Sequence, residues 1–178
     1  MGTRGAVAFG NADEWHGVYS HSDSMPTILG PNLWKIVSAE RARPDGLAGL
    51  RGRLLASGGV EAFLAGQASP EPLELSNATA QPLHISYVYV IVPVTSKLHV
   101  LMGDPRADVI PIDSLALIKP EAWHYVCLES YPLAGPEPDW RGCGAAWRLR
   151  NCERHIRSIR ERFGEDAAAS ARREWLAK

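Results

Sequence analysis

Side chains that commonly take part in acid–base chemistry are concentrated early in the chain, where imidazoles, carboxylates and hydroxyls follow one another closely. If a strand runs through residues 19–23, its alternation places Tyr19, His21 and Asp23 on one face. A carboxylate close to an imidazole orients the ring and stabilises its charged form, as a general acid or base requires. The spacing therefore predicts His21 as the acid or base, Asp23 as its orienting partner and Tyr19 as a hydrogen-bond donor.

The same residues also have a structural interpretation. Asp23 and Ser24 are typical of an Asx turn that leads into Pro26, in which case His21 only closes the strand. In the catalytic interpretation, Ser22 and Ser24 surround the imidazole with hydroxyls and bind substrate. The sequence is compatible with both interpretations.

Arg4 is the candidate group for binding an anion. It lies between Thr3 and Gly5 in the first expected strand. A guanidinium that projects from this position would hold an anionic group through two parallel hydrogen bonds. A surface ion pair is the alternative role for the same side chain.

Two segments carry a family resemblance: Thr3-Arg4-Gly5 and Tyr19-x-His21-x-Asp23-Ser24-x-Pro26-x-x-x-Gly30. In these segments the chain resembles a family of small proteins from bacteria, phages and fungi, whose members open with M-x-T-R-G. The hairpin at residues 87–100 is also similar to one in that family. The resemblance favours a site at residues 19–23 but implies no particular activity. The relatives tend to end the central strand in acidic residues, whereas this chain has Val92-Pro93-Val94, which argues against a metal-dependent activity.

The three cysteines, Cys127, Cys143 and Cys152, are odd in number and irregularly spaced, so we expect free thiols and no disulfide framework. Cys152 and His155 are spaced so that both could bind one zinc ion from a helix. Paired Cys-x-x-Cys motifs are absent from the sequence, and Cys152 falls in an apolar stripe. The sequence therefore favours a core cysteine and no metal site.

Positive charge is concentrated in the C-terminal segment. Residues 141–178 contain ten basic and five acidic side chains, although the whole chain has a formal net charge of −1. Arg150, Arg154 and Arg157 are candidates for contacts with a nucleic acid or an acidic protein. Glu153 four residues before Arg157 is instead typical of a solvated helix, which is the alternative interpretation.

The pattern of apolar residues predicts an α+β fold, with an antiparallel or mixed sheet built from two hairpins and packed by helices. We expect an α+β core domain at residues 1–140, with Arg-rich C-terminal helices at residues 141–178 packed on it. The expected elements are a hairpin at 6–19, helices at 31–43, 46–57 and 60–64, a central strand at 83–94 paired with 98–102, an edge strand at 109–117, and helices from 149 onward.

Three segments are less regular. Residues 67–82 hold three prolines among polar residues, so we expect a loop there. Residues 121–129 fit either a helix or a strand. Residues 131–144 are rich in proline and glycine, and we expect a loop that covers the site.

With 178 residues, 46% of them apolar, the chain can bury a core without disulfides. The sequence shows no apolar run long enough to span a bilayer and no apolar leader, so we expect a cytoplasmic protein. The leading hypothesis is a hydrolase or transferase that acts on a small polar or anionic substrate. The alternative is a non-enzymatic module that binds through its Arg-rich helix. The sequence assigns no cofactor.

Overall fold

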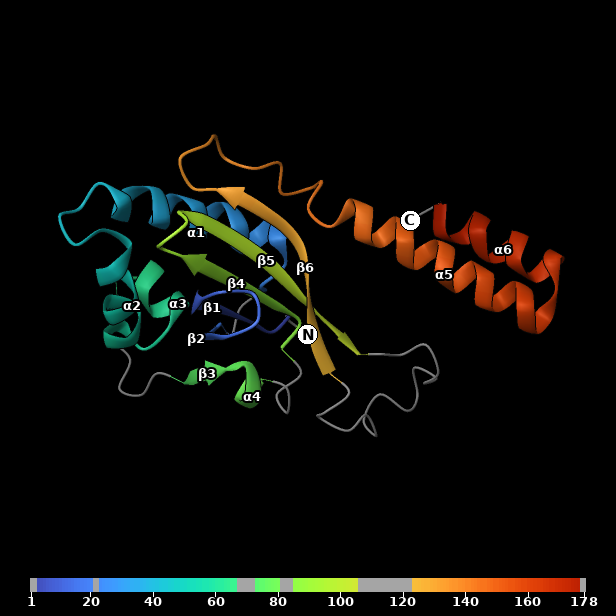
Figure 1. The fold of residues 1–178 in the computed structure, drawn as a ribbon, viewed down its shortest axis with the longest axis horizontal. Coiled ribbons are helices and arrows are strands. Elements are labelled where there is room, and N and C mark those ends of the chain that lie inside the picture. The colour runs from blue at the N-terminus through green and yellow to red at the C-terminus, as the bar shows by residue number, and fades with distance from the viewer. Residues whose placement is uncertain (1–2, 21–22, 67–72, 81–84, 106–122, 177–178) are drawn as a thin grey trace. The chain divides into compact units, whose positions relative to one another are not determined.

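The computed structural model describes residues 3–20, 23–66, 73–80, 85–105 and 123–176 (Figure 1). The chain divides into two compact units, Met1–Arg141 and Gly142–Lys178. The first unit contains a β-sheet with helices, and the second contains a pair of helices. The expected packing of the second unit on the first stays a prediction.

The sheet of the first unit is mixed. In the described residues its six strands lie in the order β3-β2-β1-β4-β5-β6. Strands β1 and β4 are parallel, and every other neighbouring pair is antiparallel. The strands are β1 (Gly5–Gly10), β2 (Trp15–Ser20), β3 (Glu74–Ser76), β4 (Tyr87–Val92), β5 (Lys97–Pro105) and β6 (Trp123–Pro132). This sheet, with its helices, confirms the predicted α+β class.

Alternation along the strands produces two apolar faces of the sheet, which we name after residues of β4. The Tyr89 face contains Val7, Val18, Tyr89, Ile91, Leu98 and Val100. The Val90 face contains Ala6, Ala8, Trp15, Val88, Val90 and Leu101. Each of these side chains is at most 2% exposed. The predicted central strand is therefore confirmed within the bounds of β4, which lies inside the sheet and is buried on both faces.

Three helices follow the first hairpin: α1 (Pro26–Arg41), α2 (Gly46–Ser57) and α3 (Val60–Leu64). The bounds predicted for the first helix, 31–43, are wrong at its start. The helix begins one turn earlier, because Pro26 occupies a position where its missing N–H costs no hydrogen bond. Helix α2 has the predicted bounds and ends at Gly58, whose φ of 85° suits glycine.

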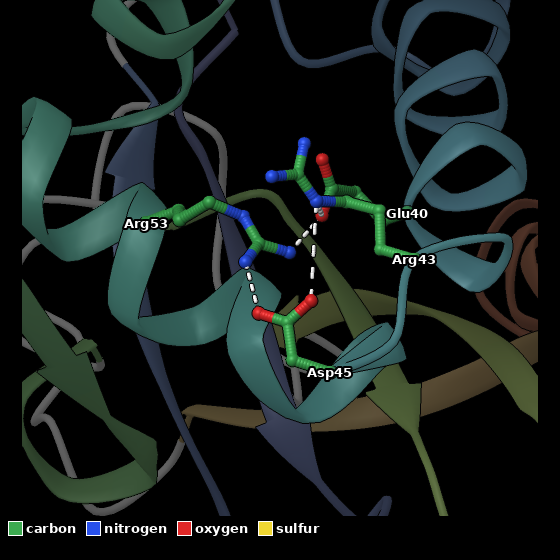
Figure 2. Close-up of polar contacts among 4 residues, drawn as sticks. All are labelled: Glu40, Arg43, Asp45 and Arg53. Carbon is green, nitrogen blue, oxygen red and sulfur yellow. Dashed lines mark hydrogen bonds and ion pairs between the residues drawn. The ribbon is translucent and has the colours of Figure 1, made fainter.

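An ion-pair cluster of Glu40, Arg43, Asp45 and Arg53 joins the end of α1 to α2 (Figure 2). The Arg53 guanidinium bridges the carboxylates of Glu40 and Asp45. Arg43 Nε lies 3.6 Å from Glu40 Oε2. Because the Glu40 side chain is only 9% exposed, its charge depends on these arginines. The cluster therefore fixes how α1 and α2 meet.

Residues 133–140 run along α1 after β6 ends. Leu133 N–H donates to Ser96 O at 2.8 Å, at the turn between β4 and β5. Trp140 packs edge-to-face on Trp34 of α1, with ring centroids 6.2 Å apart. A Cβ on Gly30 would lie 2.5 Å from Trp140 Cδ2, so the indole rests directly on that glycine. The predicted loop is thus anchored along the helix.

The structure assigns secondary structure to two segments that are irregular in sequence. Residues 73–80, part of the expected loop, form β3 and the short helix α4 (Asn77–Ala80), so the prediction is wrong there. The polar composition of this segment gives no strand pattern, but β3 pairs with β2. In that pairing Leu75 is opposite Gly17 and is buried. Of the segment 121–129, which fitted either a helix or a strand, the described residues 123–129 belong to strand β6. The expected edge strand at 109–117 lies outside the described residues.

The second unit consists of α5 (Ala145–Phe163) and α6 (Glu165–Leu176), so the predicted C-terminal helices are present, although the first begins four residues before the predicted start at 149. Gly164, with a φ of 88°, separates the two helices. Ile156 and Ala168 are buried against each other, and Ile159 packs beside them. Phe163, the last residue of α5, is 73% exposed.

Candidate active site at the end of strand β2

The predicted motif begins at the last residues of β2. The strand ends at Ser20, not at Asp23, so strand alternation does not extend through the motif. His21 and Ser22 lie outside the described residues. Asp23 is half-buried, and its Oδ1 accepts the Met25 N–H at 3.3 Å. This is the Asx turn of the structural interpretation, placed just before α1.

A chain of side-chain hydrogen bonds closes this turn. The Ser24 hydroxyl donates to Ser20 Oγ at 3.0 Å, and the Ser20 hydroxyl donates to Glu61 Oε1 at 2.6 Å. Ser20 and Ser24 are fully buried, whereas Glu61, on α3, is half-buried. The two serines therefore join the end of β2 to the start of α1, with a carboxylate as the final acceptor.

Hydrogen bonds to main-chain atoms tie the same turn to the N-terminal segment and to Tyr89. Ser24 N–H donates to Thr3 O at 2.9 Å, and the Tyr89 hydroxyl donates to Ser24 O at 2.7 Å. Arg4 O accepts the N–H groups of Ser86 at 3.0 Å and Tyr87 at 3.3 Å. Arg4, which is exposed, therefore lies one residue before β1, and not in the first strand as expected, at the end of β1 where the turn lies. Gly5 is required there, because a Cβ would overlap the Ser24 side chain.

Tyr19 lies on the other face of the sheet. Its register partner is Ala6, and it packs with the apolar cluster of the Val90 face. Ser20, one residue later, points to the Tyr89 face, where it meets Glu61. The structure therefore brings the turn at Asp23 and Ser24 to the segment of Arg4 but separates the Tyr19 side chain from the two serines.

Two other titratable groups have shifted pKa values. Burial, and then the charge of Lys97, lower the pKa of His99 below its ordinary value of 6.5. Burial, and then the charge of Glu129, raise the pKa of the Cys127 thiol above its ordinary value, although the Glu129 backbone opposes this. His99 is therefore neutral at neutral pH, and Cys127 is a thiol of low reactivity.

Metal-binding groups do not gather in the described residues, where no three His, Cys, Asp or Glu side chains are placed to share an ion. Cys127 is exposed and Cys143 is buried, both as free thiols. The side chains of Cys152 and His155 lie outside the described part of the structure. In the helices that are described, none is both long and apolar enough to cross a membrane.

Sequence reasoning missed Glu61 and Tyr89 as partners of the motif. Glu61 is 41 positions from Ser20, and Tyr89 is 65 positions from Ser24. Both residues were assigned only to their elements, a short helix and a central strand. No short-range spacing connects them with the turn, so only the fold could find them.

Comparison with known proteins gives no relative: no family model, no curated protein and no solved structure matches the chain. The resemblance to the family of small proteins therefore stays a prediction. Any function must be argued from the chain's own residues.

Proposed function

We propose that the protein is a hydrolase or transferase that acts on a small polar or anionic substrate at the end of β2. In this proposal His21 is the general acid or base, Asp23 orients it and Arg4 holds the anionic group. Ser22 contributes a hydroxyl. Ser24, being buried with its hydroxyl donated to Ser20, holds the turn.

The observation that carries the proposal is the Ser24 N–H bond to Thr3 O. It joins the turn that bears Asp23 to the segment that bears Arg4, although Thr3 and Ser24 are 21 positions apart in the sequence. Arg4 and Asp23 lie just beyond the paired ends of β1 and β2, where Gly5 is opposite Ser20. In this proposal the guanidinium binds the anionic group and the carboxylate orients the imidazole. Asp23 Oδ1 accepts one backbone N–H, and its second oxygen can accept an imidazole N–H.

Two substitutions of Asp23 separate catalysis from turn formation. Asp23→Asn keeps an oxygen that accepts the Met25 N–H but removes the charge that would stabilise an imidazolium. Asp23→Ala removes both. If Asp23 serves the site, we expect both variants to lose function; if it serves only the turn, only Asp23→Ala has an effect, a loss of about 1 kcal/mol of stability.

Native mass spectrometry of the purified protein is the test, with a panel of small anions added. We expect a small molecule that wild type retains and that His21→Ala and Asp23→Asn lose. The matched control is the double variant Asp13→Ala with His16→Ala, because both residues are exposed on the same hairpin. Equal retention by the control and by the site variants would contradict the proposal.

The second candidate function is binding of a polyanion, either a nucleic acid or an acidic protein, through α5. The described arginines that favour it are Arg157, Arg160 and Arg162, which are exposed while Ile156 faces α6. Arg160 also pairs with Glu165, with Nε to Oε2 at 2.7 Å, which reduces the charge available. The candidate contacts at Arg150 and Arg154 stay predictions.

Salt-dependent binding to labelled single-stranded RNA and to an acidic peptide tests this candidate. The triple variant Arg150→Glu, Arg154→Glu and Arg157→Glu should abolish binding, while His21→Ala leaves it intact. Reversing three exposed cations elsewhere, Lys35, Arg51 and Lys97, makes the same net charge change and is the control. Equal losses in both triple variants would mean non-specific attraction and would remove the candidate.

A further inference from the structure

Glu61 is a carboxylate at the turn between β2 and α1 that no sequence pattern connects with that turn. It projects from α3 and accepts the Ser20 hydroxyl at 2.6 Å, a short distance typical of a bond to a charged oxygen. Ser20 is fully buried, so its hydroxyl depends on a protein acceptor. Loss of the acceptor would leave the buried Ser20 hydroxyl without its bond to a charged group, which costs more than loss of an exposed bond.

We propose that Glu61 is a positioning residue, which sets the turn between β2 and α1 through the chain Ser24 to Ser20 to Glu61. The inference rests on the proposed function, because it names the side chain that places Asp23 and Arg4 for binding. Glu61 itself touches no substrate in this proposal.

The direction of the hydrogen bonds explains why the carboxylate matters. Ser20 donates to Glu61, which leaves the Ser20 oxygen as acceptor for the Ser24 hydroxyl. Without an acceptor at Glu61, the Ser20 hydroxyl is free to rotate and to donate to Ser24 instead. The chain would then have no fixed order, and the Ser24 side chain would lose its single orientation.

Ser24 transmits that orientation to the N-terminal segment. Its N–H, its carbonyl and its hydroxyl all take part in hydrogen bonds, to Thr3, Tyr89 and Ser20. A shift of Ser24 must therefore disturb the bond to Thr3, and with it the start of β1 at Arg4. Asp23, which directly precedes Ser24, moves with it.

Hydrogen exchange of the ligand-free full chain, followed by NMR, tests the positioning step. In Glu61→Leu we expect the Ser24 amide to exchange at least about tenfold faster, since a hydrogen bond to a charged group is lost, while the Val90 amide in β4 changes less. Glu61→Gln keeps an acceptor and should restore slow exchange. Glu74→Leu, at an exposed glutamate of β3, is the control.

Unchanged exchange at Ser24, equal acceleration at Ser24 and Val90, or failure of Glu61→Gln to restore protection would each overturn the role of Glu61.

The link to function is measured separately by titrating inorganic phosphate and following the Arg4 Nε–H signal. We expect a saturable shift in wild type and in Glu61→Gln, and at least about tenfold weaker binding in Glu61→Leu. Wild-type affinity in Glu61→Leu would also overturn the proposal, whereas no shift in wild type would remove Arg4 as the anion clamp and so count against the proposed function.

Discussion

His99 is a titratable residue whose surroundings make the stability of the fold depend on pH. It lies opposite Val90 in the β4–β5 ladder, and its Nδ1 is buried with no hydrogen-bond partner among the described residues. Burial, and then Lys97, lower its pKa, so the unfolded chain binds a proton more readily than the folded one. The contribution to stability is therefore fully present above the ordinary pKa of 6.5, and it is lost as the pH falls from there through the lower pKa of the folded protein.

Replacing His99 with Gln should make stability less dependent on pH. The effect is small because the imidazole is partly exposed to water. Between about pH 7.5 and pH 5.5, we expect the free energy of unfolding to fall further in wild type than in His99→Gln, by about 0.5 kcal/mol or less. Urea unfolding at the two pH values measures this difference. His16→Gln, at an exposed position of β2, should behave like wild type. A variant with the wild-type pH dependence would show that His99 does not carry the effect.

At the scale of elements, the contact of Gly30 with Trp140 holds the loop after β6 on α1. A Cβ at Gly30 would overlap the indole ring, so Gly30→Ala must displace Trp140. We expect a loss of about 1–3 kcal/mol, the usual cost of overpacking. Gly52→Ala in α2 is the matched control, because nothing lies within 4 Å of a Cβ there. That variant should gain about 0.5–1 kcal/mol from helix propensity, so opposite signs in urea unfolding are expected.

The ion-pair cluster between α1 and α2 gives a second prediction at this scale. Glu40 is 9% exposed and Asp45 is 49% exposed, yet both bind Arg53. Glu40→Gln should cost about 1–3 kcal/mol, because it leaves a partly buried guanidinium without its main counter-ion. Asp45→Asn should cost about 0–1 kcal/mol, as exposed ion pairs do. Equal losses of stability in thermal unfolding would show that burial does not determine how much each ion pair contributes.

Most elements were predictable because their periodicity is local. The alternation of Ala6 and Ala8 with their neighbours predicts β1, and the spacing of Leu47, Leu50 and Leu54 predicts α2. The start of α1 was missed because two prolines, Pro26 and Pro31, both suit a first turn. β3 was missed because its identity comes from pairing with β2, which is a tertiary interaction that no local pattern encodes.

The candidate site was predictable only in part, and for a related reason. Asp23 could be given two roles from its spacing, and the structure supports the turn by showing the bond to Met25 N–H. Glu61 could not be found, because its contact with Ser20 exists only after α3 packs beside β2. Side-chain partners that are distant in sequence are a property of the fold, whereas turn chemistry is a property of neighbouring residues.

For the whole molecule, the division after Arg141 predicts two units of unequal stability. The first unit has a sheet with two buried faces, and its core includes fully or almost fully buried residues from β1, β2, β3, β4 and β5. The described core of the second unit is small, comprising Ile156, Ala168 and Ile159. A chain of fewer than about 40 residues rarely buries enough surface to fold alone.

We therefore expect a chain that ends after Arg141 to unfold in one cooperative transition, and a peptide of residues 142–178 to be weakly helical in water. Circular dichroism during urea unfolding measures both. Because the truncated chain keeps Trp140 on α1, near-ultraviolet dichroism should preserve its tryptophan signal from the first unit. A truncated chain without a cooperative transition would show that the sheet depends on the C-terminal helices, as the predicted packing of residues 141–178 on the core domain would allow. A cooperative transition at a lower urea concentration would instead measure how much those helices stabilise the sheet.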